Sequence, residues 1–229
     1  MTTKLIIVRP EPGNAATVAM ATGEGLQAIG MPLQKVAPVE WSPPEGEFDG
    51  LLVGSANVFR HGGPCLAQLR EIPVYAVGEK TAEAARENGF TVAASGAGGL
   101  QSVIDGIIPA KPMNLLRLAG LNRVRLQLPK NISMSVKTVY KLEDCDIAQV
   151  ELEHFARSVF VMLHSVTAAE NFIRNCNSLD IDRKNISLAV IGPRVAQEVG
   201  DGWAEVAIAT APNDAALLEL AKQLCNKPG

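Results

Sequence analysis

The chain has 229 residues, of which 47% are apolar and 20% charged, and its formal net charge is −3 at pH 7. This length fits one large or two small domains, and the composition is that of an ordinary globular protein. No apolar run reaches the roughly 18 residues of a membrane span, and no basic field favours nucleic acid. We therefore expect neither a membrane nor a nucleic acid as partner.

The cysteines are scattered along the chain and form no C-x-x-C pair. There are four of them, Cys65, Cys145, Cys176 and Cys225. This spacing argues against zinc and for reduced thiols in the cytoplasm. The apolar core of the N-terminal segment is too short for a signal peptide. We therefore predict a cytoplasmic protein without a metal site.

In chain order, the first predicted element is a buried strand at Lys4–Val8. A turn at 10–13 follows, and then a helix from about Ala15 to Ala28. Asn14 is the expected N-cap of this helix, and Gly30 is expected to end it.

Two later segments differ from the rest of the chain. Residues 32–42 contain prolines that a central strand would not accept, and residues 135–144 alternate between polar and apolar. We expect each of them to form an edge strand or a linker.

Apolar strands alternate with helical segments in the remaining sequence. The expected strands are 50–53, 74–77, 91–94 and 115–118 between the two unusual segments, and 159–163, 187–191 and 204–207 after them. Strands of this kind imply parallel sheets that are covered by helices on both faces. The later set lacks a first strand, which the N-terminal strand can supply.

The chain also contains an internal repeat. Residues 77–85, VGEKTAEAA, recur as residues 191–199, IGPRVAQEV, and in each copy a glycine separates an apolar strand from a helix. The strand before each copy ends in a serine, Ser55 or Ser165. Two similar α/β units therefore lie in one chain, and a cleft between them is the default place for a ligand.

These observations predict an α/β fold with two similar parallel-sheet domains joined by a two-stranded antiparallel linker. Domain 1 is discontinuous and consists of residues 1–31 plus 145–229. The linker consists of residues 32–42 and 135–144, and domain 2 is inserted at residues 43–134.

The turns after the strands are the most informative sites, because parallel α/β sheets bind ligands at the carboxyl ends of their strands. Helix N-termini there suit carboxylates or phosphates. The residues at these turns are Ser55, Gly78, Thr81, Ser165, Thr167, Gly192 and Arg194. Each serine or threonine alone can be a helix cap, and each glycine a tight turn. Their recurrence in both halves favours two facing anion-binding rims.

Tyr140 lies on the second linker segment, where its hydroxyl could donate a proton and its ring could pack at the domain junction. Three basic residues lie in or shortly after the strand at 115–118. We expect Arg125 to be solvated, whereas Arg117 and Arg123 could either bind a carboxylate or be solvated.

Other patterns carry less weight. The run 96–101, GAGGLQ, lacks the third glycine of a dinucleotide-binding turn. His164 precedes Ser165, but neighbouring side chains in a strand face opposite ways, so this pair does not predict a nucleophile with its base. His61 and His154 lie in polar surroundings and are expected at the surface.

Short motifs follow one another along nearly the whole chain. They are VRP at 8–10, GSAN at 54–57, AVGEKTA at 76–82, LRLAGLNR at 116–123, TVY at 138–140, LHSVTA at 163–168 and IGPRVA at 191–196. In this order, and with a tyrosine in the linker, the chain resembles the uroporphyrinogen-III synthase family of porphyrin and haem biosynthesis.

The resemblance implies an enzyme with a cleft between two α/β domains and with no metal or organic cofactor. Its reaction would be the cyclisation of hydroxymethylbilane, a linear polycarboxylate, to uroporphyrinogen III with inversion of ring D and loss of water. Tyr140 would assist departure of the hydroxyl. The substrate-binding residues would be Arg9, Ser55, Asn57, Gly78, Thr81, Arg117, Ser165, Thr167, Gly192 and Arg194. We expect a monomer.

Some positions depart from the family pattern. Ala56 and Val166 stand where proline often follows the rim serine, and Arg194 and Val195 stand where a hydroxyl residue is common. Arg194 could bind a substrate carboxylate, or it could mark a relative that binds without turnover. The alternative function is therefore a non-catalytic anion- or tetrapyrrole-binding module of the same fold. An unrelated solute-binding or sugar-transfer protein should carry an export signal or acidic metal ligands, which we do not find.

Overall fold

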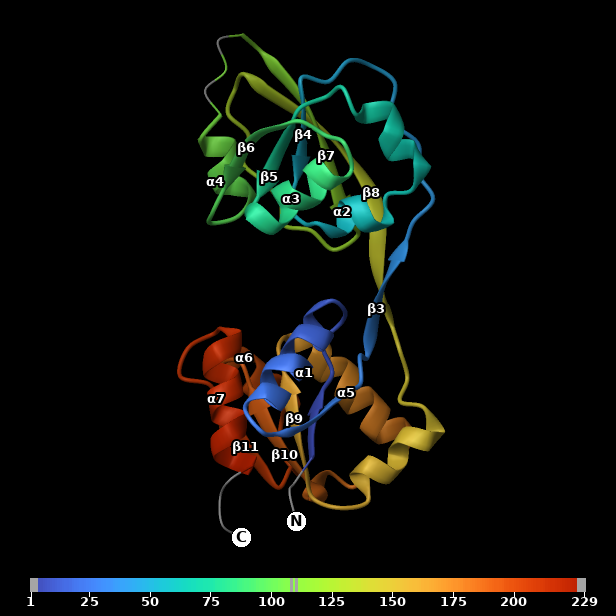
Figure 1. The fold of residues 1–229 in the computed structure, drawn as a ribbon, viewed down its shortest axis with the longest axis vertical. Helices are drawn as coiled ribbons and strands as arrows, with labels where there is room; N and C mark the ends of the chain where they lie inside the picture. Colours follow the sequence, from blue (N-terminus) through green and yellow to red (C-terminus); the bar gives the residue numbers. More distant parts are fainter. Residues whose placement is uncertain (1–3, 108, 110, 226–229) are drawn as a thin grey trace. The chain divides into compact units, whose positions relative to one another are not determined.

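The computed structural model describes residues 4–107, 109 and 111–225. The chain divides into two compact units: one joins the residues up to Lys35 with those from Glu143 onward, and the other is Val36–Leu142. Each unit is built on its own sheet (Figure 1). None of the helices in the described residues combines the length and apolar character of a membrane span.

The sheet of the first unit has the order β11-β10-β9-β1-β2, and its strand pairs are parallel. The strands are β1 (Lys4–Ile7), β2 (Gln27–Gly30), β9 (Val159–Leu163), β10 (Ile186–Val190) and β11 (Glu205–Ile208). The α-helices are α1 (Gly13–Gly23), α5 (Val166–Ser178), α6 (Pro193–Val199) and α7 (Asp214–Cys225). The chain adds β2 on one side of β1 and β9 on the other, so the strand order changes direction between β1 and β9.

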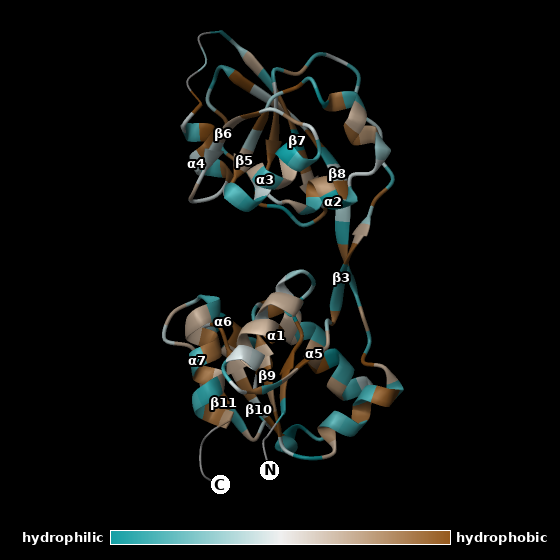
Figure 2. Ribbon diagram, in the orientation of Figure 1, coloured by the Kyte–Doolittle hydropathy of each residue, from teal (hydrophilic) through white to brown (hydrophobic). Residues whose placement is uncertain are grey.

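Alternate residues of β1 face different helix layers. Ile6 packs in a cluster with Phe172 of α5, whereas Leu5 packs in a second cluster with Ala21 of α1 and Leu217 of α7. All five side chains are completely buried. Burial of a large apolar side chain contributes about 1.5–3 kcal/mol, which explains why near-continuous apolar runs form the strands of this sheet (Figure 2).

The predicted helix from Ala15 to Ala28 is wrong at both ends. Helix α1 ends at Gly23, and residues 27–30 form strand β2. The helix stops because Gly25 has a φ of +83°, which returns the chain to the sheet, and the Leu26 amide then donates to the Ala21 carbonyl at 3.0 Å. Asn14 is not an N-cap. It lies inside α1, is 2% exposed and donates through Nδ2 to backbone carbonyls of the preceding segment.

The sheet of the second unit has the order β3-β8-β7-β4-β5-β6, in which β4 to β8 pair in parallel. The strands are β3 (Gln34–Pro38), β4 (Gly50–Val53), β5 (Val74–Val77), β6 (Val92–Gly96), β7 (Met113–Gly120) and β8 (Ile132–Asp144). The α-helices are α2 (Asn57–His61), α3 (Glu79–Glu87) and α4 (Leu100–Asp105). The strand order changes direction between β4 and β7.

Helices cover both faces of this second sheet. Leu51 packs with Phe59 of α2 and Ala82 of α3, while Leu52 faces the other side and packs with Ile104 of α4. The prediction of an α/β protein with parallel sheets is thereby confirmed.

Strand β3 is an edge strand of the second sheet and β8 is its neighbour, and both strands continue into residues of the first unit. The Val39 amide donates to the Val139 carbonyl at 3.1 Å, and Lys35 Nζ lies 3.5 Å from a carboxylate oxygen of Glu143. These contacts hold the two segments side by side where the chain passes from one unit to the other.

Candidate functional site

Ligands of parallel α/β sheets bind at the carboxyl ends of the strands, where the strand order changes direction. In the second unit this point lies between β4 and β7, and in the first unit it lies between β1 and β9. Ser55 follows β4, and Gly120 ends β7. Arg9 follows β1, and Ser165 follows β9. Predicted site residues therefore lie at the switch point of each sheet.

A pocket of about 150 Å³ lies at the β4–β7 switch point of the second unit. Three of the predicted site residues, Ser55, Arg117 and Tyr140, line it together with Gly120 and Arg123. Among the described residues that border the pocket, two are arginines and none is acidic. The pocket therefore combines positive charge with two hydroxyl groups, and we name it the switch-point pocket.

Tyr140 reaches the switch-point pocket from β8. The pairing of β7 with β8 is irregular between Ala119 and Gly120, where Ala119 pairs with Thr138 and Gly120 with Tyr140. The Leu121 amide then donates to the Tyr140 carbonyl at 3.0 Å. This irregular step fixes the backbone from which the half-buried Tyr140 ring projects.

Arg117 is 4% exposed, so the alternative that it is solvated is wrong. Its Nη1 donates to the Val124 carbonyl at 2.8 Å, while its Nε is buried without an acceptor among the described residues. Burial and then the charge of Arg123 lower the pKa of Arg117, whereas Tyr140 acts in the opposite direction. Arg123, which also lines the pocket, donates through Nη1 to Thr138 Oγ1 at 2.9 Å. Arg125 is exposed, as expected.

The other predicted residues of the second unit lie outside the lining of the switch-point pocket. Asn57 begins α2, and its amide donates to Ser55 Oγ at 3.2 Å. Gly78 has a φ of +74° before α3, a conformation that favours glycine, and its carbonyl accepts from the Thr81 amide at 3.1 Å. Thr81 is 5% exposed.

At the β1–β9 switch point of the first unit, Arg9 is held by other side chains. Its Nη1 lies 2.7 Å from Asp214 Oδ2 and donates to Thr17 Oγ1 at 3.3 Å. The His164 side chain is 7% exposed, with Nε2 3.9 Å from Asp214 Oδ1 and with no hydrogen-bond partner among the described residues for either ring nitrogen. Burial and then the charge of Arg9 lower the pKa of His164 to about 4. The sequence reasoning missed both Asp214 and this burial of His164.

The remaining predicted residues of the first unit lie at helix starts. Ser165 caps α5, because its Oγ accepts from the Ala168 amide at 3.1 Å. Thr167 in the first turn of α5 and Arg194 in the first turn of α6 are exposed. Gly192 precedes α6 with an extended backbone, at a φ of −177°.

The histidines and cysteines form no cluster. His61 and His154 are both partly exposed, and Lys4 Nζ is 3.0 Å from His154 Nδ1. The cysteines are all free. Within the described part of the chain, no three His, Cys, Asp or Glu side chains could hold a metal ion together.

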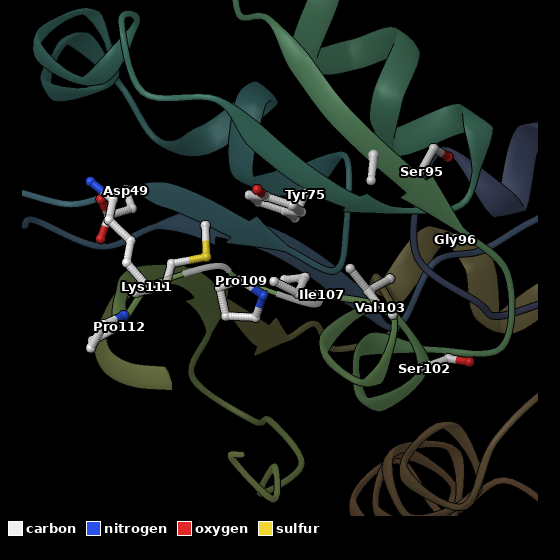
Figure 3. Close-up of a pocket in the computed structure, with 13 residues that line it drawn as sticks. Asp49, Tyr75, Ser95, Gly96, Ser102, Val103, Ile107, Pro109, Lys111 and Pro112 are labelled. Atoms are coloured by element: carbon white, nitrogen blue, oxygen red, sulfur yellow. The ribbon is translucent and has the colours of Figure 1, made fainter. Parts of the chain in front are cut away.

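A larger pocket, of about 550 Å³, lies on the α4 side of the second sheet. Figure 3 shows the Tyr75 ring and the side chains of Val103 and Ile107 along it, with Asp49 and Lys111 at one end. None of the residues predicted to bind substrate lines this pocket. The switch-point pocket is therefore the stronger candidate, despite its smaller volume.

A comparison with protein-family models settles the family. The model described as uroporphyrinogen-III synthase HemD matches residues 15–219. The chain belongs to the uroporphyrinogen-III synthase family. The match spans both units of the structure. It confirms the predicted family and the cyclising lyase activity, and the non-catalytic alternative is not favoured.

Solved structures of uroporphyrinogen-III synthases are similar to this chain. The structure from Helicobacter pylori is 20% identical with a TM-score of 0.63, and the alignment covers 97% of this chain and 99% of that one. A wild-type structure from Thermus thermophilus is 15% identical with a TM-score of 0.42, covering 96% of this chain and 97% of that one. A comparison with curated protein sequences gave no match. The likeness to the Helicobacter pylori structure shows a shared fold.

Proposed function

We propose that this protein cyclises hydroxymethylbilane to uroporphyrinogen III, with loss of water and inversion of ring D. Membership of the uroporphyrinogen-III synthase family supports this activity. The observation that carries the proposal is the switch-point pocket, in which the predicted residues Ser55, Arg117 and Tyr140 lie together. A pocket with positive charge and hydroxyl groups suits a substrate with many carboxylates.

Tyr140 is the proposed catalytic residue. A phenol is protonated at neutral pH and can donate its proton or a hydrogen bond. We propose that the Tyr140 hydroxyl donates to the hydroxyl of the hydroxymethyl group as the carbon–oxygen bond breaks and water leaves. The electron pair of the adjacent pyrrole nitrogen stabilises the azafulvene cation that remains. General acid assistance of this kind contributes about 10²–10⁴ in rate.

Most of the remaining catalysis is orientation of the two chain ends. Uncatalysed closure proceeds without inversion, so the protein must hold the polycarboxylate in the geometry that leads to the inverted isomer. We propose that substrate carboxylates are held by residues at the strand ends and helix starts of both units. These are Arg9, Ser55, Asn57, Gly78, Thr81, Arg117, Ser165, Thr167, Gly192 and Arg194. All of them except Arg117, which lies within β7, follow β1, β4, β5, β9 or β10, and these positions support this assignment.

We also propose the domain organisation on which this binding depends. Domain 1 is residues 1–31 plus 145–229 and domain 2 is residues 43–134, and residues 32–42 and 135–144 form a two-stranded antiparallel linker. The division into two units, with β3 adjacent to β8, supports this organisation. We propose that the protein acts as a monomer in the cytoplasm without a cofactor; its unpaired cysteines suit a reducing compartment.

The test is a coupled assay in which the purified protein receives freshly generated hydroxymethylbilane. The products are oxidised, and the type I and type III isomers are separated. We expect type III to predominate over the enzyme-free control. Type I alone from folded protein would contradict the proposed function.

A further inference from the structure

Arg117 is a buried cation that has no acidic partner in the part of the chain that the structure describes. It is 4% exposed, and among the described residues only the Val124 carbonyl accepts a hydrogen bond from it. Its backbone neighbours in the sheet are apolar, Leu52 on β4 and Val136 on β8. A buried charge is costly unless another charge or several hydrogen bonds compensate it. The protein alone supplies little compensation, so the site is suited to an anion from outside.

The opening beside Arg117 is the switch-point pocket. Arg123 also lines it, and no acidic side chain of the described residues does. The charge of Arg123 lowers the pKa of Arg117, as expected for two cations that share one environment. Both charges therefore favour an anion in the pocket over a neutral or cationic group.

Hydroxyl groups border the same pocket. Ser55 Oγ accepts the Asn57 amide, which leaves the hydroxyl proton of Ser55 able to donate to a ligand. Tyr140 lines the pocket from β8. At about 150 Å³ the pocket can hold one group of about the size of benzene, which is one arm or one ring of a tetrapyrrole but not the whole molecule.

We propose that the switch-point pocket is a subsite for a single carboxylate arm of the substrate, with Arg117 as its cation. The inference rests on the proposed function, because the arm belongs to hydroxymethylbilane. A carboxylate held on the free donors of Arg117 places the attached pyrrole ring next to Tyr140. Arg117 is therefore a specificity-determining residue: it selects which ring presents its substituents to the Tyr140 hydroxyl.

The first experiment compares Arg117→Met, Arg117→Lys and the control Arg125→Met, whose parent side chain is exposed in the loop that follows β7. Methionine keeps the apolar stem of Arg117 and removes the charge, so we expect a melting temperature no lower than that of the wild type. We expect Arg117→Met to raise KM at least about tenfold and to increase the type I share. The KM and the type I share of Arg117→Lys should lie between those of Arg117→Met and the wild type. Those of Arg125→Met should stay within about twofold of the wild-type values.

A purely structural role for Arg117 gives the opposite pattern. If its function is only to donate a hydrogen bond to the Val124 carbonyl, Arg117→Met should lower the melting temperature. The KM and the isomer ratio of the folded fraction should then be unchanged. That result would overturn the subsite. Failure of the proposed function is a separate outcome, because it appears in the wild type as type I product alone.

A second measurement follows the wild type itself and needs a folded variant only to assign one resonance. The side-chain Nε–H resonance of Arg117 is assigned by its absence in Arg117→Lys and followed by ¹H–¹⁵N NMR. Titration with uroporphyrinogen III, kept reduced, should shift this resonance in a saturable way while that of Arg125 stays unchanged. An Arg117 resonance that does not move at saturating product would refute the subsite even if the enzyme is active.

Discussion

The ring of Tyr140 lies directly against the backbone of Gly120. A methyl carbon at Gly120 would be 2.7 Å from Cε2, 2.8 Å from Cζ and 3.1 Å from the hydroxyl oxygen of Tyr140. Because Cβ atoms do not approach other atoms below about 3.0 Å, any side chain at this position must displace the ring. Gly120 is therefore the residue that allows Tyr140 its place beside the switch-point pocket.

Replacing Gly120 by alanine should move Tyr140 and so reduce turnover. We expect Gly120→Ala to lower kcat at least about tenfold, because small misplacements of a reacting group are costly. Overpacking should also reduce the free energy of unfolding by about 1–3 kcal/mol. Steady-state kinetics and urea unfolding measure both effects. Gly23→Ala is the matched control, since no atom lies within 4 Å of its added carbon.

A double-mutant cycle shows whether the effect acts through Tyr140. If it does, Gly120→Ala adds little to the loss already caused by Tyr140→Phe, because residues in contact are not additive. A full additional loss in the double variant would mean that Gly120 acts by another route.

Tyr140→Phe should lower kcat by about 10²–10⁴ while the fold stays intact. Its hydroxyl makes no hydrogen bond to another described residue, so its removal should change the free energy of unfolding by less than about 0.5 kcal/mol. Rapid-quench kinetics with isomer analysis, together with urea unfolding, tests both statements. An unchanged kcat would remove Tyr140 from the mechanism.

The parallel α/β fold could be predicted because its central strands consist of consecutive apolar residues. Residues 50–53 are buried throughout, and four of the five residues of β9 are buried, so the sequence alone indicates strands covered on both faces. The helix predicted from Ala15 to Ala28 failed because β2 is a four-residue strand at the sheet edge with a mixed burial pattern. So short a strand has no periodicity that distinguishes it from a helix.

The site was predictable in part from chain order. Ser55 follows a strand end, and Tyr140, which lies within β8, was expected from its place on the linker segment. The burial of Arg117, in contrast, depends on the loop that supplies the Val124 carbonyl. The pair of Arg9 with Asp214 joins residues 205 positions apart. No local sequence pattern predicts such a contact, because it arises from the packing of α7 on the sheet that contains β1.

Asn14 should contribute to stability although it is not a helix cap. Its Nδ2 donates to the Ile7 carbonyl at 2.6 Å and to the Arg9 carbonyl at 3.1 Å inside the protein. Asn14→Ala leaves these carbonyls without that donor, and we expect a loss of about 1–3 kcal/mol in the free energy of unfolding. Asn88→Ala removes a similar donor, Nδ2 to the Ala84 carbonyl at 2.8 Å, but at an exposed residue where water can replace it, so the loss should be no more than about 0.5 kcal/mol. Equal losses in both variants by urea unfolding would contradict the assigned role.

His164 should make the protein less stable in mild acid. Burial, with the charge of Arg9, lowers its pKa from 6.5 to about 4, so between these values the unfolded chain binds a proton that the folded protein does not. The free energy of unfolding must therefore fall as the pH drops from about 6.5 toward about 4, by up to about 3 kcal/mol. The effect is absent above about pH 6.5, where His164 is neutral in both states.

His164→Gln tests this prediction, because glutamine is polar but does not titrate. Urea unfolding of the wild type and the variant at several pH values between 4 and 7 gives the difference between their free energies. We expect the wild type to lose stability relative to the variant as the pH falls, since only the wild type must exclude a proton from this buried ring. Parallel pH profiles would show that burial does not keep the proton off His164, and they would contradict the prediction.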